Sequence, residues 1–350
     1  MLLELTDQGL YCPAGSFHVD PWQPVNRAVI THAHSDHACR GSRHYLTSRQ
    51  GGLVLRARLG DEAQIQTVEY GEQIDFDGVR VSLHPAGHVL GSSQVKIERQ
   101  GEIWVVSGDY KLDADPTCSP FEPLRCHTFI TEATFGLPIY RWPAQSDTFS
   151  AIQKWWRNNQ KEAKASLLFA YSLGKAQRLL AGLEPSIGTV FTHGAIEHLS
   201  QTYRASGISL PTTIFVGGAP KNTNWSQALV LAPPSAQGTP WMRKLGDLST
   251  AFASGWMQIR GARRRRSIDR GFVLSDHADW PGLLSAIRAT GAERVWVTHG
   301  YTAVVARWLQ ENGLDAQPLQ TQFAGETDDA NEVLPLANQG TTVSSGEEKL

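Results

Sequence analysis

The sequence predicts an α/β fold in which two sheets pack face to face and a second α/β unit is inserted into the first. Strand-like runs separated by glycine turns dominate residues 1–134, with few helical stretches, and this pattern is typical of sandwiched sheets. From 135 to 266, strands alternate with helices, which predicts the inserted unit. The first unit is expected to resume over 267–323. The polar, acidic segment 324–350 has no apolar periodicity and is expected to be a flexible tail.

The alternation of apolar residues locates the expected elements of the first part. One helix is expected at 48–59. The expected strands cover 2–6, 9–11, 27–31, 66–69, 79–84, 94–98, 103–107 and 129–131.

The spacing of apolar residues also predicts the elements of the inserted unit and of the segment after it. Helices are expected at 147–161 and 173–183, and strands at 166–171, 188–192, 212–216 and 228–232. A strand at 271–274, a helix at 281–289 and a strand at 293–298 are expected after it.

Composition narrows the class of protein. The 350 residues are enough for two domains, and a net charge of −2 neither supports nor excludes a nucleic-acid partner, because a local patch decides that question. No apolar run is long enough to cross a bilayer, and the N-terminus lacks a basic region followed by an apolar core, so a cytoplasmic protein without a signal peptide is expected. The four cysteines form no Cys-x-x-Cys pair, which favours reduced thiols over a disulfide framework.

The densest group of metal-binding residue types follows the strand expected at 27–31. His32, His34, Asp36 and His37 fall within six positions. Residues two apart in an extended chain point the same way, and a turn there lets the last two side chains face a second point nearby. Histidine and carboxylate ligands without cysteine suit zinc, or else manganese or iron, in a hydrolytic site. The alternative is a surface histidine cluster.

Two further candidates stand where strands end. His88 follows a glycine in a tight turn, which would bring the backbone close to a metal. Asp109 ends a β-run, and one carboxylate at such a place can bridge two metals. Alone, the first would be a core or surface histidine and the second a turn aspartate. Their order behind the first motif favours the metal site.

Two other segments leave alternatives open. Four consecutive arginines at 263–266, with Arg260 before and Arg270 after, form either a solvated basic loop or an edge that contacts phosphates. Asp20-Pro21-Trp22 either shapes the pocket or forms a turn with a packed tryptophan.

These motifs together resemble the β-CASP branch of the metallo-β-lactamase superfamily, in which an α/β β-CASP domain is inserted into a metallo-β-lactamase αββα sandwich and the members process nucleic acids. The carriers of the resemblance, in chain order, are His32-x-His34-x-Asp36-His37, His88, Asp109, Glu132, His277 and His299. Within the branch, the chain is most similar to the bacterial ligase-associated DNA exonucleases, through the segments 9–13, 20–22, 191–195 and 275–280.

The resemblance implies two divalent metals, zinc first with manganese as the alternative, and hydrolysis of a phosphodiester bond. The first metal would take three histidines, and the second would take two histidines and a carboxylate: His32, His34 and His88, then Asp36, His37 and His299. Asp109 would bridge both metals, with a hydroxide between them. His277 would serve the leaving oxygen, and Glu132 would fix the orientation of His277.

Substrate contacts are expected from hydroxyl and basic side chains. Ser92 and Ser93 would bind a terminal phosphate beside the metals, and Lys175 is a second phosphate candidate. The candidate arginines at the edge of the substrate groove are Arg260, Arg263, Arg264, Arg265, Arg266 and Arg270. The alternative for each of these residues is a solvated or packing role.

The resulting hypothesis is a DNA exonuclease of 5′-to-3′ polarity that acts in DNA repair, with an ATP-dependent DNA ligase as partner and no membrane association. An RNA-processing nuclease of the same fold is the alternative, because His299 occupies a position where animal DNA-repair members of the branch usually lack histidine. A small-molecule hydrolase is disfavoured, since His277 and Glu132 have no role in it. An inactive scaffold is disfavoured, since every expected ligand position is filled.

Overall fold

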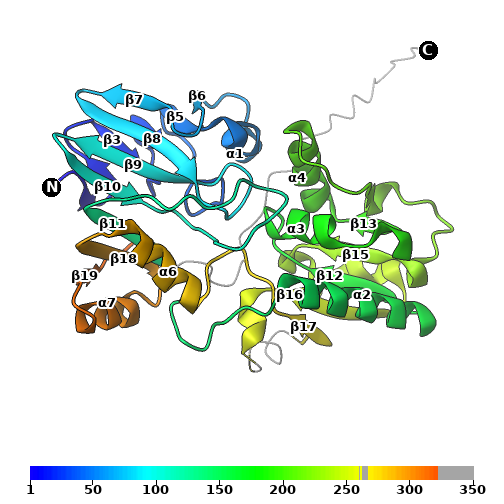
Figure 1. The fold of residues 1–350 in the computed structure, drawn as a ribbon. Helices are drawn as coiled ribbons and strands as arrows, with labels where there is room; N and C mark the ends of the chain where they lie inside the picture. Colours follow the sequence, from blue (N-terminus) through cyan, green and yellow to red (C-terminus); the bar gives the residue numbers. More distant parts are fainter. Residues whose placement is uncertain (260, 262–266, 322–350) are drawn as a thin grey trace, which may run out of the picture.

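The computed structural model describes residues 1–259, 261 and 267–321, and these residues form three sheets (Figure 1). The first has the order β1-β2-β3-β4-β5-β6. Its strands are β1 (Glu4–Thr6), β2 (Gly9–Cys12), β3 (Phe17–Val19), β4 (Arg27–Val29), β5 (His44–Ser48) and β6 (Ile65–Val68). Helix α1 (Gly52–Leu59) follows β5 after one 3-10 turn and packs beside β5 and β6.

The second sheet has the order β19-β18-β11-β10-β9-β8-β7. Its strands are β7 (Gln73–Phe76), β8 (Val79–Pro85), β9 (Ser93–Arg99), β10 (Glu102–Val106), β11 (Thr128–Ala133), β18 (Arg294–Gly300) and β19 (Asp315–Pro318). Neighbours from β7 to β10 are antiparallel, whereas β10, β11, β18 and β19 run parallel. The chain therefore leaves this sheet after β11 and returns to it at β18.

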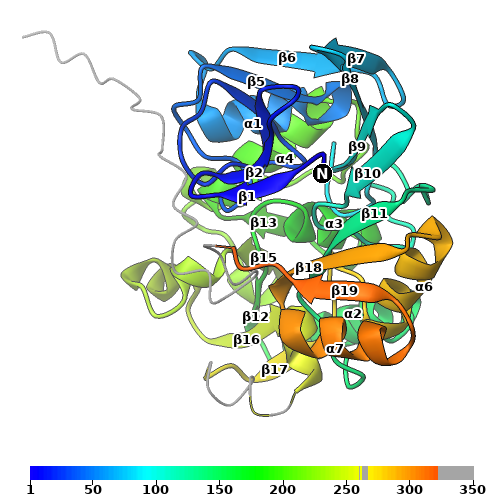
Figure 2. The same cartoon turned by 90° about the vertical axis from the view of Figure 1, so that its left-hand side faces the viewer.

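Alternating side chains of the second sheet build two separate cores. Val105 and Phe129 face α6 (Trp280–Thr290) and α7 (Thr302–Glu311), which cover the outer side of the sheet (Figure 2). Their chain neighbours Val106 and Ile130 face the first sheet and pack in one cluster with residues of β3, β4 and β5. Because successive side chains of a strand point to opposite faces of the sheet, one strand contributes residues to both cores.

The third sheet is entirely parallel, in the order β14-β13-β15-β12-β16-β17. Its strands are β12 (Ala165–Phe169), β13 (Val190–Thr192), β14 (Ile214–Phe215), β15 (Leu229–Ala232), β16 (Leu248–Ala253) and β17 (Arg270–Phe272). Helices α2 (Gln145–Lys161) and α3 (Lys175–Gly182) cover one face. Helix α4 (Gly194–Ala205) packs against α1, so the third sheet and its helices adjoin the first sheet.

The structure confirms an α/β fold and corrects several expected elements. The strand expected at 271–274 is β17, which forms an edge of the third sheet instead of resuming the first unit. Strands β3, β5, β7, β16 and β19, together with helices α4 and α7, had no corresponding expectation. The expected tail at 324–350 lies outside the described residues. Among the described helices, none combines the length and apolar character that a bilayer crossing requires.

Gly87 provides a test of the turn that positions His88. Its φ is +74°, and a Cβ there would lie 2.2 Å from the Lys111 carbonyl oxygen. Gly78 has a similar φ of +81° but no neighbour within 4 Å, so it is a matched control. We expect Gly78→Ala to lower the free energy of unfolding by about 1 kcal/mol through backbone strain alone. Gly87→Ala should lower it by about 3 kcal/mol or more, because a backbone clash adds to the strain. Denaturant unfolding measures both values, and equal losses would contradict this account.

Candidate metal centre

The side chains of the candidate centre come from the carboxyl ends of strands and from the loops that follow them. The histidine motif follows β4, His88 follows β8 and Asp109 follows β10. Glu132 and His299 lie near the ends of β11 and β18, and His277 follows β17. The fold brings these segments together although they span residues 32 to 299, and the described residues form three overlapping groups able to hold a metal ion.

The first group consists of three histidines and Asp109. The Nδ1 atom of His34 lies 3.1 Å from Nε2 of His32 and 3.1 Å from Nε2 of His88. The Asp109 Oδ2 atom is 3.6 Å from the first of these Nε2 atoms and 3.9 Å from the second. Nitrogens that share one zinc ion at about 2.0–2.1 Å lie at comparable separations from one another. The donor set and its spacing therefore fit a metal.

The outer nitrogen of each of these rings is fixed by an oxygen. His88 Nδ1 donates to the Asp276 carbonyl at 3.0 Å, and His34 Nε2 lies 3.3 Å from the Leu173 carbonyl. His32 Nδ1 lies 3.0 Å from the hydroxyl oxygen of Thr31. A carbonyl accepts only, so the proton sits on the outer nitrogen and the inner nitrogen presents its lone pair to the centre.

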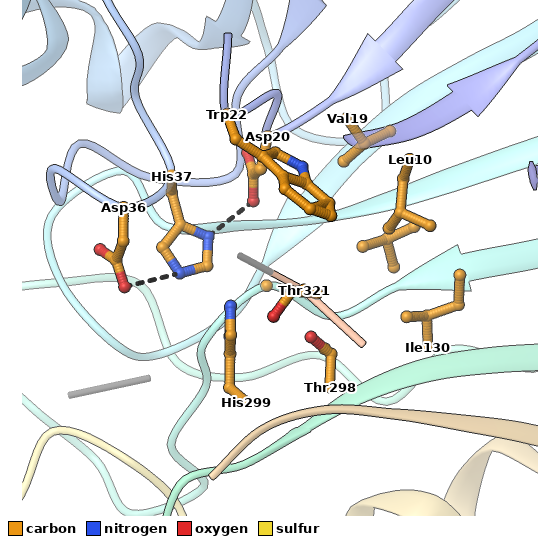
Figure 3. A pocket seen from close by; sticks show the side chains of 12 residues that line it. Leu10, Val19, Asp20, Trp22, Asp36, His37, Ile130, Thr298, His299 and Thr321 are labelled. Atoms are coloured by element: carbon orange, nitrogen blue, oxygen red, sulfur yellow. Dashed lines mark hydrogen bonds and ion pairs between the residues drawn. The ribbon is translucent and has the colours of Figure 1, made fainter. Parts of the chain in front are cut away.

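The second group contains His37, Asp109 and His299. His37 Nε2 is 3.4 Å from Asp109 Oδ2, and His299 Nδ1 is 3.6 Å from Asp109 Oδ1. Asp36 approaches from the same side, with its Oδ2 atom 3.7 Å from His37 Nε2 (Figure 3). Within the described part of the chain, His37 Nε2 and Asp109 Oδ1 are buried without a hydrogen-bond partner. Leaving such atoms unpaired is costly, and a cation would satisfy both.

His299 carries backbone strain as well. Its φ is +56°, which is uncommon for a residue with a Cβ, and Gly300 after it has φ +70°. A Cβ on Gly300 would lie 2.4 Å from the Ala133 carbonyl oxygen. The strained pair sets the direction in which the imidazole leaves β18, and such strain is typical of functional sites.

Asp20 joins the centre although sequence reasoning gave it no such role. Its Oδ2 atom accepts a hydrogen bond from His37 Nδ1 at 2.7 Å and one from the Thr31 hydroxyl at 2.6 Å. Its Oδ1 atom accepts from the Thr31 backbone N–H at 2.8 Å. The carboxylate thus orients His37 directly and also fixes the hydroxyl beside His32. The sequence signals were its place just upstream of the histidine motif and the resemblance carried by the segment 20–22, and neither of them indicated a contact with His37.

Protonation differs between the two groups. Burial, reinforced by neighbouring histidines, lowers the pKa of His32 and of His88 well below 6.5, so both side chains are neutral at neutral pH. Burial also acts to lower the pKa of His37, but the carboxylates of Asp109, Asp36 and Asp20 outweigh it and raise that pKa well above 6.5. Burial acts to raise the pKa of Asp109, and His37 and His299 reverse the effect and lower it. Metal binding at the second group must therefore displace a proton from His37, and rising pH favours it.

The third group pairs His277 with Glu132 beside Asp109. His277 Nδ1 lies 3.0 and 2.9 Å from the two Glu132 carboxylate oxygens. Glu132 Oε1 also accepts from the Tyr110 backbone N–H at 2.8 Å. Both side chains are almost fully buried, so the pair is held in one orientation.

A buried ion network anchors the loop at 275–277. The Asp276 carboxylate lies 3.5 Å from Lys175 Nζ and 3.4 Å from Arg178 Nη1, and Arg178 Nη1 also donates to the Ser275 carbonyl at 2.6 Å. Burial acts to raise the pKa of Asp276, but these two cations outweigh it and lower that pKa to about 2. The structure thus gives Lys175 a role that differs from the predicted phosphate contact, because its fully buried ammonium group supports the loop.

The other predicted substrate contacts are two buried serines, one exposed arginine and five arginines outside the described residues. Ser92 and Ser93 are buried: the first hydroxyl accepts from the backbone N–H groups of His88 and Val89, and the second donates to the Gly91 carbonyl. They shape the turn instead of facing a substrate. Arg270 is exposed, with its guanidinium group 5.1 Å from the centre of the Phe272 ring. Arg260, Arg263, Arg264, Arg265 and Arg266 lie outside the described residues.

Several known proteins have sequences similar to this chain. A protein of Opitutus terrae named "Probable DNA ligase" is 33% identical over 312 residues, which cover 88% of this chain and 30% of that protein. The cleavage and polyadenylation specificity factor 73 of Drosophila melanogaster is 31% identical over 125 residues, and the endoribonuclease YSH1 of Saccharomyces cerevisiae is 28% identical over 123 residues. Each of these two matches covers 35% of this chain. These similarities support the β-CASP family of metallo-β-lactamase-like proteins.

The chain spans less than a third of the length of each of these relatives, with shares of 30%, 18% and 16%. No family model matches it. Among solved structures, a protein of unknown function from Enterococcus faecalis V583 superposes with a TM-score of 0.53 and 14% identity. That match covers 86% of this chain and 80% of the other, and it supports the overall fold.

The orienting role of Asp20 leads to a prediction. We expect Asp20→Asn to weaken zinc binding about 10- to 100-fold, because the neutral amide no longer stabilises the orientation and charge of His37. Asparagine tolerates the left-handed backbone at this position, where φ is +44°, so the fold should persist. Competition with a chromophoric chelator measures the affinity, and Asp7→Asn on the exposed surface serves as the control. Equal affinities for the two variants would contradict the proposed role.

Proposed function

We propose that this protein is a nuclease that hydrolyses phosphodiester bonds with two divalent metals, zinc first and manganese as the alternative. The observation that carries the proposal is the carboxylate of Asp109, which belongs to two adjacent ligand groups. The proposed ligands are His32, His34 and His88 on one side and Asp36, His37 and His299 on the other, with Asp109 shared. Two bound divalent metals would supply a nucleophile at neutral pH and neutralise charge on a phosphate.

The residues of the chain would divide the remaining work. The Asp276 and Leu173 carbonyls and Asp20 hold histidines in the orientations that binding requires. The Glu132 carboxylate holds Nδ1 of His277, so that Nε2 is the atom from which a proton would pass to the leaving oxygen. A small-molecule hydrolase such as a lactamase is disfavoured, because His277, Glu132 and so large an inserted unit would have no role in it.

The proposed substrate is DNA, degraded from the 5′ end during repair, with an ATP-dependent DNA ligase as the functional partner. The similarity to the protein named "Probable DNA ligase" supports this choice, since it extends over 88% of the chain. The second candidate is an RNA-processing nuclease. The similarity to endoribonuclease YSH1 and the presence of His299 favour it, but that similarity extends over 35% of the chain.

Digestion of one end-labelled strand, supplied as DNA and as RNA with and without a 5′-phosphate, tests the proposal. We expect stepwise shortening of the DNA from its 5′ end in zinc or manganese. Asp109→Ala should abolish this activity, because it removes the ligand common to both groups. His277→Asn should lower turnover by roughly 10²- to 10⁴-fold while the metal content stays unchanged.

The possible outcomes separate the candidates. Internal cuts confined to RNA would favour an RNA-processing nuclease. Failure to cleave either polymer by protein that holds both metals would contradict nuclease function. Equal activity of the Asp109→Ala variant would place the chemistry elsewhere in the molecule.

A further inference from the structure

We propose that a cavity beside the His37–Asp109–His299 group receives the base of the nucleotide whose phosphate lies at the metal centre. This inference rests on the proposed nuclease function and adds a binding subsite to it. Figure 3 shows the cavity between the Trp22 indole on one side and Thr298, Thr321 and His299 on the other.

The walls of the cavity divide into an apolar part and a polar mouth. The apolar part comes from five different segments of the two-sheet unit: Leu10, Val19, Trp22, Val106 and Ile130. Asp36, His37 and His299 line the cavity as well, and these residues also belong to the candidate metal centre. The cavity therefore adjoins the candidate metal centre.

One glycine allows this arrangement. Gly9 has φ +123°, and a Cβ at this position would lie 2.3 Å from the indole nitrogen of Trp22. Because this space is open, the indole lies across β2 and forms one side of the cavity. The Trp22 backbone N–H donates to the Gln8 carbonyl at 3.0 Å, which holds the main chain of Trp22 beside the turn between β1 and β2.

The size of the cavity suits one planar ring. The centres of water-sized molecules have about 50 Å³ available within it. A cavity needs roughly 10–15 Å³ of occupied volume to hold one water, so this space admits several waters. A ring that enters the cavity would displace these waters.

Thr298 supplies a polar contact inside the apolar wall. Its Oγ1 atom is buried and has no hydrogen-bond partner within the described part of the chain. A hydroxyl in this position can donate to or accept from the edge of a base. Apolar walls, an indole ring and a single unsatisfied hydroxyl form the combination that recognises a base by burial and stacking.

Geometry connects the cavity to the reaction. A nucleotide carries its base one sugar away from its phosphate, and His37 and His299 belong both to the cavity wall and to the metal-binding group. A phosphate held at that group would therefore direct the attached base toward Trp22 and Leu10. Binding of this base would help to hold the scissile bond in position.

The test compares two end-labelled DNA strands that differ only at the terminal nucleotide, which carries thymine in one and an abasic tetrahydrofuran unit in the other. We expect the abasic terminus to be removed roughly tenfold more slowly, because the contribution of the base is lost. Equal rates would overturn the subsite while leaving the nuclease function intact. Failure to cleave either strand would contradict the nuclease function, and a binding measurement then decides the subsite by itself.

That binding measurement uses metal-loaded protein with thymidine 5′-monophosphate and with deoxyribose 5-phosphate in equilibrium dialysis. The nucleotide should bind roughly tenfold more tightly. Leu10→Phe, which adds bulk to the cavity wall, should abolish this difference, and Thr298→Val should reduce it without changing the shape of the wall.

The control is Leu83→Phe, the same exchange in the same core at a residue that does not line the cavity. It should leave the difference between the two ligands intact, and thermal melting identifies any variant that has lost its fold. Equal affinities of the two ligands for the unchanged protein, or equal effects of the two phenylalanine variants, would overturn the proposal.

Discussion

The carboxylate of Asp109 is the constraint on which the rest of the centre depends. It is 5% exposed, and its oxygens lie 4.0 Å or less from nitrogens of His32, His37, His88, His277 and His299. Burying an ionised carboxylate is costly unless positive charge compensates for it. Because its pKa is raised, His37 carries one positive charge near Asp109. The two candidate ligand groups around Asp109 could hold further cations. The surroundings of Asp109 are therefore suited to hold cations.

The centre depends on both parts of the fold. His34 meets the Leu173 carbonyl just before α3, and His88 meets the Asp276 carbonyl just after β17. The cations of α3 then hold the Asp276 side chain in place. The third sheet and its helices thus supply the outer contacts of ligands that the two-sheet unit provides. A change in the position of α3 would therefore shift the candidate metal-binding histidines, although no residue of α3 is a proposed ligand.

Local signals explain how much of this could be predicted from the sequence. The histidine motif, His88 and Asp109 stand at strand ends in recognisable order, and the structure brings them together. Asp20 could not be found in this way, because its partner lies 17 residues away and the contact depends on how β3 pairs with β4. The burial of Lys175 could not be predicted either, because the sequence does not distinguish a lysine that contacts phosphate at the surface from one in a buried ion pair.

The helices and strands likewise differ in how well the sequence predicts them. Strongly apolar runs such as β12 and β15 were predicted nearly in full, because burial on both faces leaves a clear signal. Strand β5 begins with exposed His44, and α4 carries polar residues along its outer side, so their structure depends on tertiary packing. The edge position of β17 was likewise set by pairing with β16, which no local pattern encodes.

The most direct test of the account is the number of metal ions that each chain holds. Zinc-loaded protein, dialysed to remove loosely bound metal, would be analysed by mass spectrometry of the elements beside an Asp109→Ala variant. We expect two ions per chain in the unchanged protein and fewer in the variant, because both proposed ligand groups lose their common carboxylate. A content of one ion or none, or two ions retained without Asp109, would contradict it.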